Sequence, residues 1–492
     1  MDNAVNDGLK RPAHDGGNGV FRTERDLLGP REIPQNARWG VHTLRAQENF
    51  PISGIPIGAN PFLVKGMVLV KLAAARTNSR LGVLAPWRAE AIERASQEIL
   101  DNPVLYEEFV VDVMQGGAGT STNMNVNEVV ANVALELLGK ERGDYIVLHP
   151  NDHVNMMQST NDSYPTGLRV AALLSLEPLL VALTDLAKSL RAKSAEFRDV
   201  LKLGRTQLRD AVPMTLGQEF GAFSTTVLSE ITNLKNVSGQ LLSINLGGTA
   251  IGTGITAHPE FGQFATQELS QLTGYEFERA ADLVEATSDV GAFVSLSGAL
   301  KRLSLKLSKI AGDLRLLSSG PWAGLGEISL PAVQAGSSIM PGKVNPVIPE
   351  AVSQVAYLVC GHDLTVTMCA EGGQLQLNPF EPMIAHCLLS STHCLTNAVT
   401  VLATRCVDGI EADREHCRSN VEGSASIITA LVPRLGYEVC SRLAKRAAVE
   451  KRKILDLLLE EDLLPSEELA ELLRPERLTG AAARVSADSL QS

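Results

Sequence analysis

The chain is poor in aromatic residues, which make up 4% of its 492 residues, while hydrophobic residues make up 45%. Strands favour aromatic and β-branched side chains, so this composition, rich in Leu and Ala, predicts a mainly helical protein. An excess of basic residues is also missing, because 44 Lys and Arg against 56 Asp and Glu leave a formal net charge of −12. A nucleic-acid partner needs a surface that neutralises phosphates, so we expect none.

Membrane and secretion signals are missing as well. No uninterrupted apolar run is long enough to span a bilayer, and the opening residues MDNAVNDGLKRPAHDGGNG lack the apolar segment of a signal peptide. We interpret residues 1–16 as a disordered tail. The seven cysteines are odd in number and form no Cys-x-x-Cys pair, which argues against a disulfide framework or a zinc site. We therefore expect a cytoplasmic protein with reduced thiols and no membrane partner.

What the sequence does contain is a long apolar repeat with spacings of three and four. It runs from Phe293 to Leu317 and recurs over 173–190 and 220–234, and a fourth helix is expected after Pro349. Long helices with narrow apolar stripes pack nearly parallel as a bundle, or across subunits. We therefore predict an all-α fold with a central long-helix bundle. Its three domains are an N-terminal domain over 17–157, the bundle over 158–413 and a small helical domain over 414–492.

Four segments interrupt the helical pattern: 114–125, 149–167, 204–217 and 318–346. They are rich in Ser, Thr and Asn or in Gly and Pro, and the last is a long loop with apolar residues and few charges. Such a loop inside a helical protein favours function over disorder. Hydroxyls, amides and loop N–H groups bind small anions, especially carboxylates. For any single segment, capping of the following helix is the alternative.

Common cofactor and nucleophile motifs do not occur. The Gly-rich stretch 247–254 lacks the order G-x-G-x-x-G, and Gly342-Lys343 is followed by Val344 where a P-loop has Ser or Thr. G-x-S-x-G is also missing. The His and Cys spacings match no metal-ligand pattern. We therefore expect neither a metal nor a cofactor.

The string GSSIMPGKVNP at 336–346 resembles the signature of the fumarase/aspartase superfamily. Three more stretches agree with it: GGAGTSTNMNVNEV from Gly116, HPNDHVN and QSTNDSYPTG from His149 onward, and GRTQLRDAVPMTLGQE from Gly204. The resemblance implies a homotetramer whose central helices form one core, with each active site built from loops of three subunits. It also implies anti elimination of ammonia, water or an amine from a succinyl group, giving fumarate.

Within the superfamily, STNDSYPTG, HPNDHVN and LPAVQAGSSIMPGKVNPVIPE are similar to the aspartase forms. Gln207 stands where fumarases and some aspartases carry His. Hydroxide departure needs a proton that Gln cannot give, whereas ammonium leaves without one. We therefore expect reversible elimination of ammonia from L-aspartate, giving fumarate and ammonium. Trp322, Gly326 and the run at 424–429 depart from the aspartase pattern. These departures leave open a lyase for another N-substituted aspartate, and class II fumarase is the other alternative. The presence of Ser337, Lys343 and Asn345 together argues against a non-catalytic scaffold, which would have no physical need for them.

The resemblance identifies Ser337 as the general base, an alkoxide that removes a proton from a carbon beside a carboxylate. Lys343 and loop N–H groups near Ser337 would favour that anion. His149 and His153 match a peripheral anion site and are not assigned to catalysis. The residues that the resemblance places around the substrate are Thr120, Ser159, Thr160, Asn161, Thr206, Gln207, Ser338, Lys343, Asn345 and Arg45.

Overall fold

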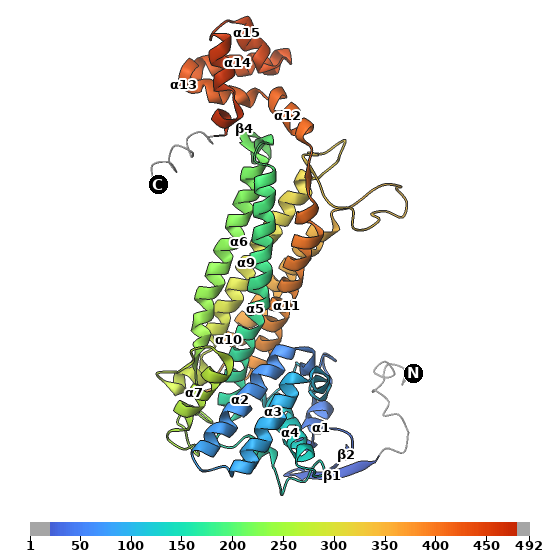
Figure 1. Ribbon diagram of the computed structural model, residues 1–492, viewed down its shortest axis with the longest axis vertical. Helices are drawn as coiled ribbons and strands as arrows, with labels where there is room; N and C mark the ends of the chain where they lie inside the picture. Colours follow the sequence, from blue (N-terminus) through green and yellow to red (C-terminus); the bar gives the residue numbers. More distant parts are fainter. Residues whose placement is uncertain (1–19, 480–492) are drawn as a thin grey trace, which may run out of the picture. The chain divides into compact units, whose positions relative to one another are not determined.

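The computed structural model describes residues 20–479, so the tail predicted over residues 1–16 lies outside the described residues. Helices make up most of the described chain (Figure 1). The strands are short and pair as four two-stranded sheets among residues 20–479. The predicted helical fold class is confirmed, although the composition gave no sign of the small sheets.

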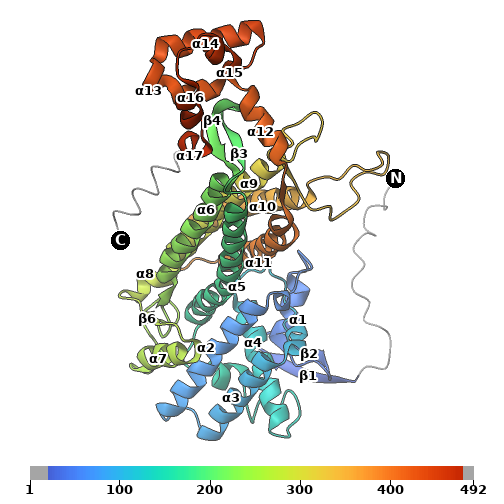
Figure 2. The same ribbon diagram turned by 45° about the horizontal axis from the view of Figure 1, so that its top comes forward.

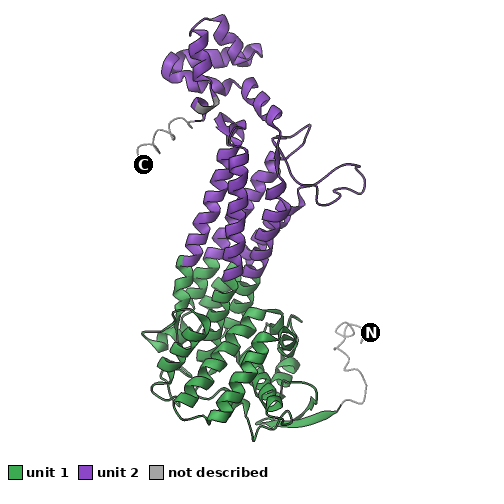
Figure 3. Cartoon of the chain, in the orientation of Figure 1, with its two compact units in different colours: residues 1–176, 236–298, 362–390 green, residues 177–235, 299–361, 391–492 purple. Residues whose placement is uncertain are grey.

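The chain divides into two compact units, each made of three stretches of sequence (Figure 3). Unit 1 contains residues 1–176, 236–298 and 362–390, and unit 2 contains residues 177–235, 299–361 and 391–492. The division does not follow the predicted domain boundaries near 157 and 413. The three-domain scheme therefore stays a prediction.

Unit 1 contains an antiparallel hairpin, a short parallel strand pair and several helices. Its α2 and α3 pack on each other, and α2 also packs on α4 and α7. The elements that lie wholly in unit 1 are β1 (Phe21–Asp26), β2 (Gly29–Pro34), α1 (Val41–Asn49), η1 (Ile57–Ala59), α2 (Pro61–Arg80), α3 (Pro86–Asp101), η2 (Pro103–Glu108), α4 (Thr120–Leu137), η3 (Pro150–Val154), η4 (Gly239–Leu242), β5 (Ser243–Ile244), α7 (Phe261–Thr273), β6 (Glu278–Arg279) and α8 (Leu283–Ser288).

Five long helices begin in one unit and end in the other. They are α5 (Thr160–Glu196), α6 (Leu216–Ser238), α9 (Gly291–Leu317), α10 (Val347–Glu371) and α11 (Glu381–Arg405). The predicted stripe on α9 is confirmed, because the eight apolar residues that repeat from Phe293 to Leu317 are at most 4% exposed. The helix expected near Pro349 is α10.

Unit 2 adds two small antiparallel sheets and a group of short helices to its parts of the long helices. In Figure 2 the β3–β4 hairpin lies beside α12. The elements that lie wholly in unit 2 are β3 (Leu201–Thr206), β4 (Arg209–Thr215), β7 (Ile328–Ser329), η5 (Val407–Gly409), β8 (Glu411–Ala412), α12 (Arg414–Gly423), η6 (Ala425–Leu431), α13 (Val432–Leu435), α14 (Tyr437–Glu450), α15 (Ile454–Glu460), α16 (Ser466–Leu472) and α17 (Pro475–Leu478).

The helix α5 is the one helix within residues 20–479 that is long and apolar enough to cross a membrane. The sequence contains no uninterrupted apolar run here because Arg169 and Glu177 interrupt it. Its most apolar window is 61% buried inside the protein. The core helix of a bundle passes the same test of length and composition, so the signal is weak.

All four segments expected as loops are partly regular, the fourth only through the short strand β7. The first ends in α4, which begins at Thr120, and the second contains η3 and the start of α5 at Thr160. The third is wrong as a loop, because residues 201–215 form the β3–β4 hairpin. Its two turn residues, Gln207 and Leu208, have φ of 54° and 60°. Neither is Gly, Asn or Asp, so the sequence carries no ordinary signal for this turn.

Candidate active site

The start of α4 places the Thr120 hydroxyl. A left-handed turn leads into the helix, with φ of 86° at Gly117 and 88° at Gly119. A Cβ atom at Gly119 would lie 2.5 Å from the Tyr164 ring, so glycine allows the start of α4 to approach α5. Thr120 Oγ1 donates a hydrogen bond to the carbonyl of Gly117 at 2.7 Å. The lone pairs of Thr120 Oγ1 are thus left to accept a hydrogen bond.

The start of α5 is capped by its own side chains. Ser159 Oγ accepts from the N–H of Asn161 at 3.2 Å, and Asp162 Oδ1 accepts from the N–H of Ser159 at 2.9 Å. This reciprocal pattern is a capping box. Because Ser159 Oγ already accepts from the protein, its own O–H remains available as a donor.

A second chain segment supports the start of α5 through the buried carboxylate of Asp162. Asp162 Oδ2 accepts from the backbone N–H groups of Gly247 and Thr249, at 3.0 and 2.9 Å. Burial raises the pKa of Asp162 to about 6. The sequence did not predict this role, because the stretch 247–254 lies far from Asp162 in the chain and matches no dinucleotide motif. The signal present in the sequence is the glycine at position 247. The structure requires it, because a Cβ at Gly247 would lie 2.6 Å from the Cα of Gly262.

Thr160 and Asn161, at the start of α5, differ in hydrogen-bonding character: Thr160 offers a donor and Asn161 offers an acceptor. Thr160 Oγ1 accepts from Nδ2 of Asn123 at 3.2 Å, so its O–H is available as a donor. Asn161 Nδ2 donates to the carbonyl of Ala250 at 2.7 Å, while its Oδ1 has no partner among the described residues. We call Thr120, Ser159, Thr160 and Asn161, with their supports Asn123 and Asp162, the polar platform. It offers two hydroxyl donors suited to a carboxylate and two acceptors suited to an amino group.

In unit 2, the exposed segment 331–345, here called the serine loop, carries Ser337. Its Oγ accepts hydrogen bonds from the backbone N–H groups of Met340 at 2.9 Å and Ile339 at 3.2 Å. Two N–H groups aimed at one hydroxyl oxygen stabilise negative charge on it. The N–H groups expected near Ser337 are thus present in the structure. The role of Ser337 as the base stays a prediction.

Contacts across the base of the serine loop hold its two ends together. The N–H of Gly336 donates to the carbonyl of Lys343 at 2.9 Å, and Asn345 Nδ2 donates to the carbonyl of Gly336 at 2.7 Å. Lys343 Nζ makes no hydrogen bond or ion pair within residues 20–479, and Ser338 is exposed. Because α10 begins at Val347, the positive end of its dipole lies beside Asn345.

The β3–β4 hairpin carries Thr206 and Gln207 at its exposed turn. A buried charge cluster anchors the hairpin near the entry to the serine loop. Glu327, with a fully buried side chain, pairs with Arg205 at 2.7 Å and with Lys202 at 2.9 Å. Glu327 directly precedes β7. The structure thereby joins the element that carries Thr206 and Gln207 to the segment that leads into the serine loop.

Arg45 lies apart from the polar platform in the contacts of unit 1. It forms two hydrogen bonds with the carboxylate of Asp26, at 2.6 and 2.7 Å, and one with the carbonyl of Gly29. The hydrogen bond from Arg45 lowers the pKa of Asp26. Its side chain is 12% exposed, so it is not a free surface cation. Its predicted place near the substrate stays a prediction.

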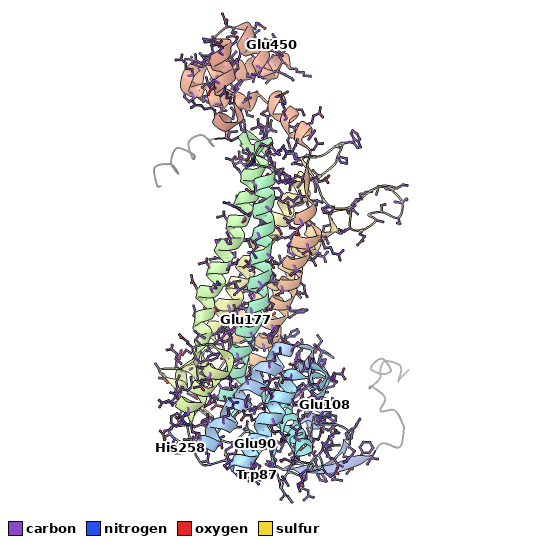
Figure 4. The ribbon with its side chains drawn as sticks, viewed as in Figure 1. Trp87, Glu90, Glu108, Glu177, His258 and Glu450 are labelled. Atoms are coloured by element: carbon purple, nitrogen blue, oxygen red, sulfur yellow. The ribbon has the colours of Figure 1, made fainter. Side chains whose placement is uncertain are left out.

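Two other features fall outside the predicted residues. His149 and His153 bond within their own segment, because His153 Nδ1 accepts from the N–H of His149 at 2.7 Å. A cavity of about 640 Å³ lies among α2, α3 and α7, and Glu90 is one of its lining residues. Figure 4 labels Glu90. Arg76 in that cavity is paired with Glu93. No group of three or more His, Cys, Asp or Glu that could hold a metal occurs within residues 20–479.

Apart from Arg45, the predicted site residues thus fall into three groups: the polar platform in unit 1, and the serine loop and hairpin turn in unit 2. Comparison with known proteins identifies the family to which the chain belongs. The family model described as "Lyase" matches residues 29–361, and that described as "Fumarase C C-terminus" matches residues 427–480.

Individual relatives agree over nearly the whole chain. Aspartate ammonia-lyase of Pseudomonas fluorescens is 54% identical over 459 residues, which cover 93% of this chain and 96% of that relative. Aspartate ammonia-lyase of Escherichia coli K12 is 51% identical over 458 residues, with coverage of 93% and 96%.

Solved structures give the same result. A fumarate lyase:delta crystallin from Brucella melitensis, bound to cobalt, has a TM-score of 0.90 and 54% identity, covering 93% of this chain and 99% of that one. Class II fumarase from Schistosoma mansoni has a TM-score of 0.87 and 33% identity, covering 93% and 98%. The chain belongs to the aspartate ammonia-lyase family of the fumarase/aspartase superfamily.

Proposed function

We propose that the chain catalyses the reversible elimination of ammonia from L-aspartate, giving fumarate and ammonium. The observation that carries this proposal is the pair of backbone N–H groups on Ser337 Oγ. A serine alkoxide is otherwise too basic to persist near neutral pH. The family relatives named above supply the expected substrate.

The reaction begins when the Ser337 alkoxide removes a proton from the beta carbon of aspartate, which lies beside the side-chain carboxylate. The electron pair of the broken C–H bond moves into that carboxylate, which becomes a doubly charged enediolate. The pair then returns to form the C=C bond of fumarate, and the C–N bond breaks with its electrons on nitrogen. Ammonia leaves and becomes ammonium in water, while the Ser337 hydroxyl gives up its proton before the next cycle.

The polar platform and the serine loop divide the work of substrate binding. Ser159 and Thr160 have O–H groups free to donate to one carboxylate, whereas Thr120 Oγ1 and Asn161 Oδ1 accept from the substrate amino group. Lys343 and Asn345 hold the other carboxylate beside the start of α10. Ser338, Thr206 and Gln207 complete the set, with Arg45 at its edge.

We infer that the protein is a homotetramer in which different subunits supply the platform and the serine loop. An apolar face on α10 supports this: Tyr357, Leu364 and Met368 share one side of the helix and are 67%, 63% and 60% exposed. Such a face stabilises association with other helices. Mixing inactive Ser337→Ala and Thr160→Val chains and refolding them should restore activity. Unrestored activity from a correctly assembled mixture contradicts a shared site.

We also infer a cytoplasmic location. All seven cysteines are free, and four of them are buried. Thiols of this kind persist in a reducing compartment. Cell fractionation with antibody detection tests the inference, and recovery outside the cytoplasmic fraction would contradict it.

The decisive experiment follows the ultraviolet absorbance of fumarate after purified protein is mixed with L-aspartate or, separately, with L-malate. Production from aspartate alone is the expected result. Production from malate alone would identify a class II fumarase and overturn the proposal. If neither substrate yields fumarate, the same assay is repeated with N-substituted aspartates. No fumarate from those either would indicate a scaffold without activity.

A further inference from the structure

A fully buried lysine lies beneath the polar platform. Lys71, on α2, is 0% exposed. Its Nζ donates to three amide oxygens: Asn123 Oδ1 at 2.6 Å, Gln158 Oε1 at 2.9 Å and Asn155 Oδ1 at 3.0 Å. Burial lowers the pKa of Lys71 to about 7. The negative charge of Asp162 opposes that shift, and only the ammonium form of Lys71 offers a donor to each of the three acceptors.

The lysine determines how the neighbouring amide is turned. An ammonium group donates and cannot accept, so the oxygen of Asn123 faces Lys71. The amide nitrogen must therefore point the other way, where it donates to Thr160 Oγ1 at 3.2 Å and to Asn155 Oδ1 at 3.1 Å. Ser163 Oγ also lies 3.2 Å from Asn123 Oδ1, but its shorter hydrogen bond, 2.7 Å, goes to the carbonyl of Ser159, so the lysine is the main donor to this oxygen.

This orientation continues to the hydroxyl of Thr160. Since Thr160 Oγ1 accepts from Asn123, its single proton is directed away from Asn123 and is available to another acceptor. We propose that Lys71 and Asn123 are positioning residues that fix the Thr160 hydroxyl as a donor to a carboxylate of the substrate. The proposal rests on the proposed function for the identity of that substrate. Neither residue was singled out from the sequence.

The sharpest test reverses the polarity of the link while it keeps its size. In Asn123→Asp, one carboxylate oxygen retains the contact with Lys71 and the other replaces the amide nitrogen. Thr160 would then donate inward to the new oxygen, and the substrate would lose its donor. We expect kcat/KM for aspartate to fall about 10- to 100-fold, the usual effect of losing a hydrogen bond to a charged group.

A double-mutant cycle with Thr160→Val tests whether this loss passes through Thr160. If it does, adding Asn123→Asp to Thr160→Val leaves kcat/KM within about 2-fold of Thr160→Val alone, the scatter expected for such cycles. A general structural role predicts that the two losses multiply. Multiplied losses in folded tetramers would overturn the proposal.

The matched control is Asn127→Asp, one helical turn further along α4. Asn127 Nδ2 also donates to Asn155 Oδ1, at 3.2 Å, so this variant places the same charge in the same buried helix. Asn127 makes no hydrogen bond with Thr160 among the described residues. Its effect on kcat/KM should multiply with that of Thr160→Val. A cycle for Asn127→Asp identical to that for Asn123→Asp would also overturn the proposal.

The lysine is tested by Lys71→Met, with Lys65→Met on the same helix as control. Lys71→Met should reproduce the loss in kcat/KM, and full retention would refute a role for Lys71. If Lys71→Met fails to fold, the Asn123 cycle decides. Calorimetric binding of succinate, which has two carboxylates and no amino group, separates the two proposals. Failure of the parent with aspartate rejects the proposed function, while the cycle measured on succinate affinity still tests the positioning role.

Discussion

The polar platform and the serine loop, which share substrate binding in the proposed function, differ in how they are built. The platform is held by buried side chains from several parts of unit 1, such as Lys71, Asn123 and Asp162. The serine loop is held by its own backbone, with Ile339 83% exposed at its tip. Groups fixed by buried neighbours keep their direction before the substrate arrives, whereas an exposed loop opens locally at low cost. The difference suggests that substrate recognition is preorganised and that the base depends on loop closure.

Ser337→Ala should produce the largest effect and breaks only the loop side of the comparison. Removing the base should lower kcat about 10²- to 10⁴-fold, the usual contribution of general base catalysis. Succinate affinity should stay near that of the parent, because the platform is unchanged. A steady-state assay of fumarate release with calorimetry measures both quantities.

The assignment of Ser337 is wrong if Ser337→Ala keeps turnover within about tenfold of the parent as a tetramer, far less than a lost base costs. Ser319→Ala provides a matched control. Ser319 Oγ also accepts a backbone N–H, from Leu325 at 3.0 Å, outside the serine loop. Its activity should remain close to that of the parent.

The second prediction concerns the base of the serine loop. A Cβ atom introduced by Gly336→Ala would collide with the carbonyl of Lys343 and lie 2.8 Å from the N of Asn345. The loop must then open, so kcat should fall about tenfold or more, in line with the cost of misplaced catalytic groups. Melting temperature should hardly change. Gly423→Ala, with no atom near the added Cβ, should alter neither quantity.

The comparison also separates what the sequence could and could not predict. The stripe on α9 follows from local spacing alone, so the long helices were predictable. The Ser337 segment was found because its residues are contiguous in the chain. Lys71 and the Gly247 segment were missed, because their roles depend on distant residues meeting at the start of α5. The β3–β4 turn was missed because Gln207 and Leu208 are unusual residues for positive φ.

The third prediction concerns the polar platform. In Asp162→Asn, an amide nitrogen replaces one of two oxygens that accept backbone N–H groups from Ser159, Gly247 and Thr249. At least one of these backbone N–H donors then faces the amide NH₂ group of the new side chain, which is also a donor. Stability should fall by about 1–3 kcal/mol, the cost of an unsatisfied buried group, and KM for aspartate should rise.

Chemical denaturation and steady-state kinetics check this prediction. Asp185→Asn serves as control, since Asp185 pairs at the surface of α5 with Lys188. Surface pairs contribute about 0–1 kcal/mol. Equal losses of stability in the two variants would contradict the prediction. They would show that the buried carboxylate of Asp162 stabilises the protein no more than the surface carboxylate of Asp185 does.

The smallest expected effect concerns the segment that leads to Thr120. Asp112 accepts hydrogen bonds from the N–H groups of Ser53, Gly54 and Met114, at 2.7–2.8 Å. Burial alone would raise the pKa of Asp112, but these bonds and that of the Ser53 hydroxyl outweigh it and hold the pKa below its usual value. The carboxylate therefore adds stability above its unfolded pKa, and that stability is lost as pH falls through the lower folded pKa.

Asp112→Asn should accordingly lower the free energy of unfolding by about 1 kcal/mol at neutral pH, and the gap to the parent should close in acid. Denaturation series from pH 7 downward measure this gap. A gap that stays constant down to about pH 3, below the usual pKa of an Asp, would mean that the ionised form contributes nothing. The platform would then owe its order near Thr120 to packing, such as that of Gly119 on Tyr164, and the contrast with the serine loop would rest on shape instead of charge.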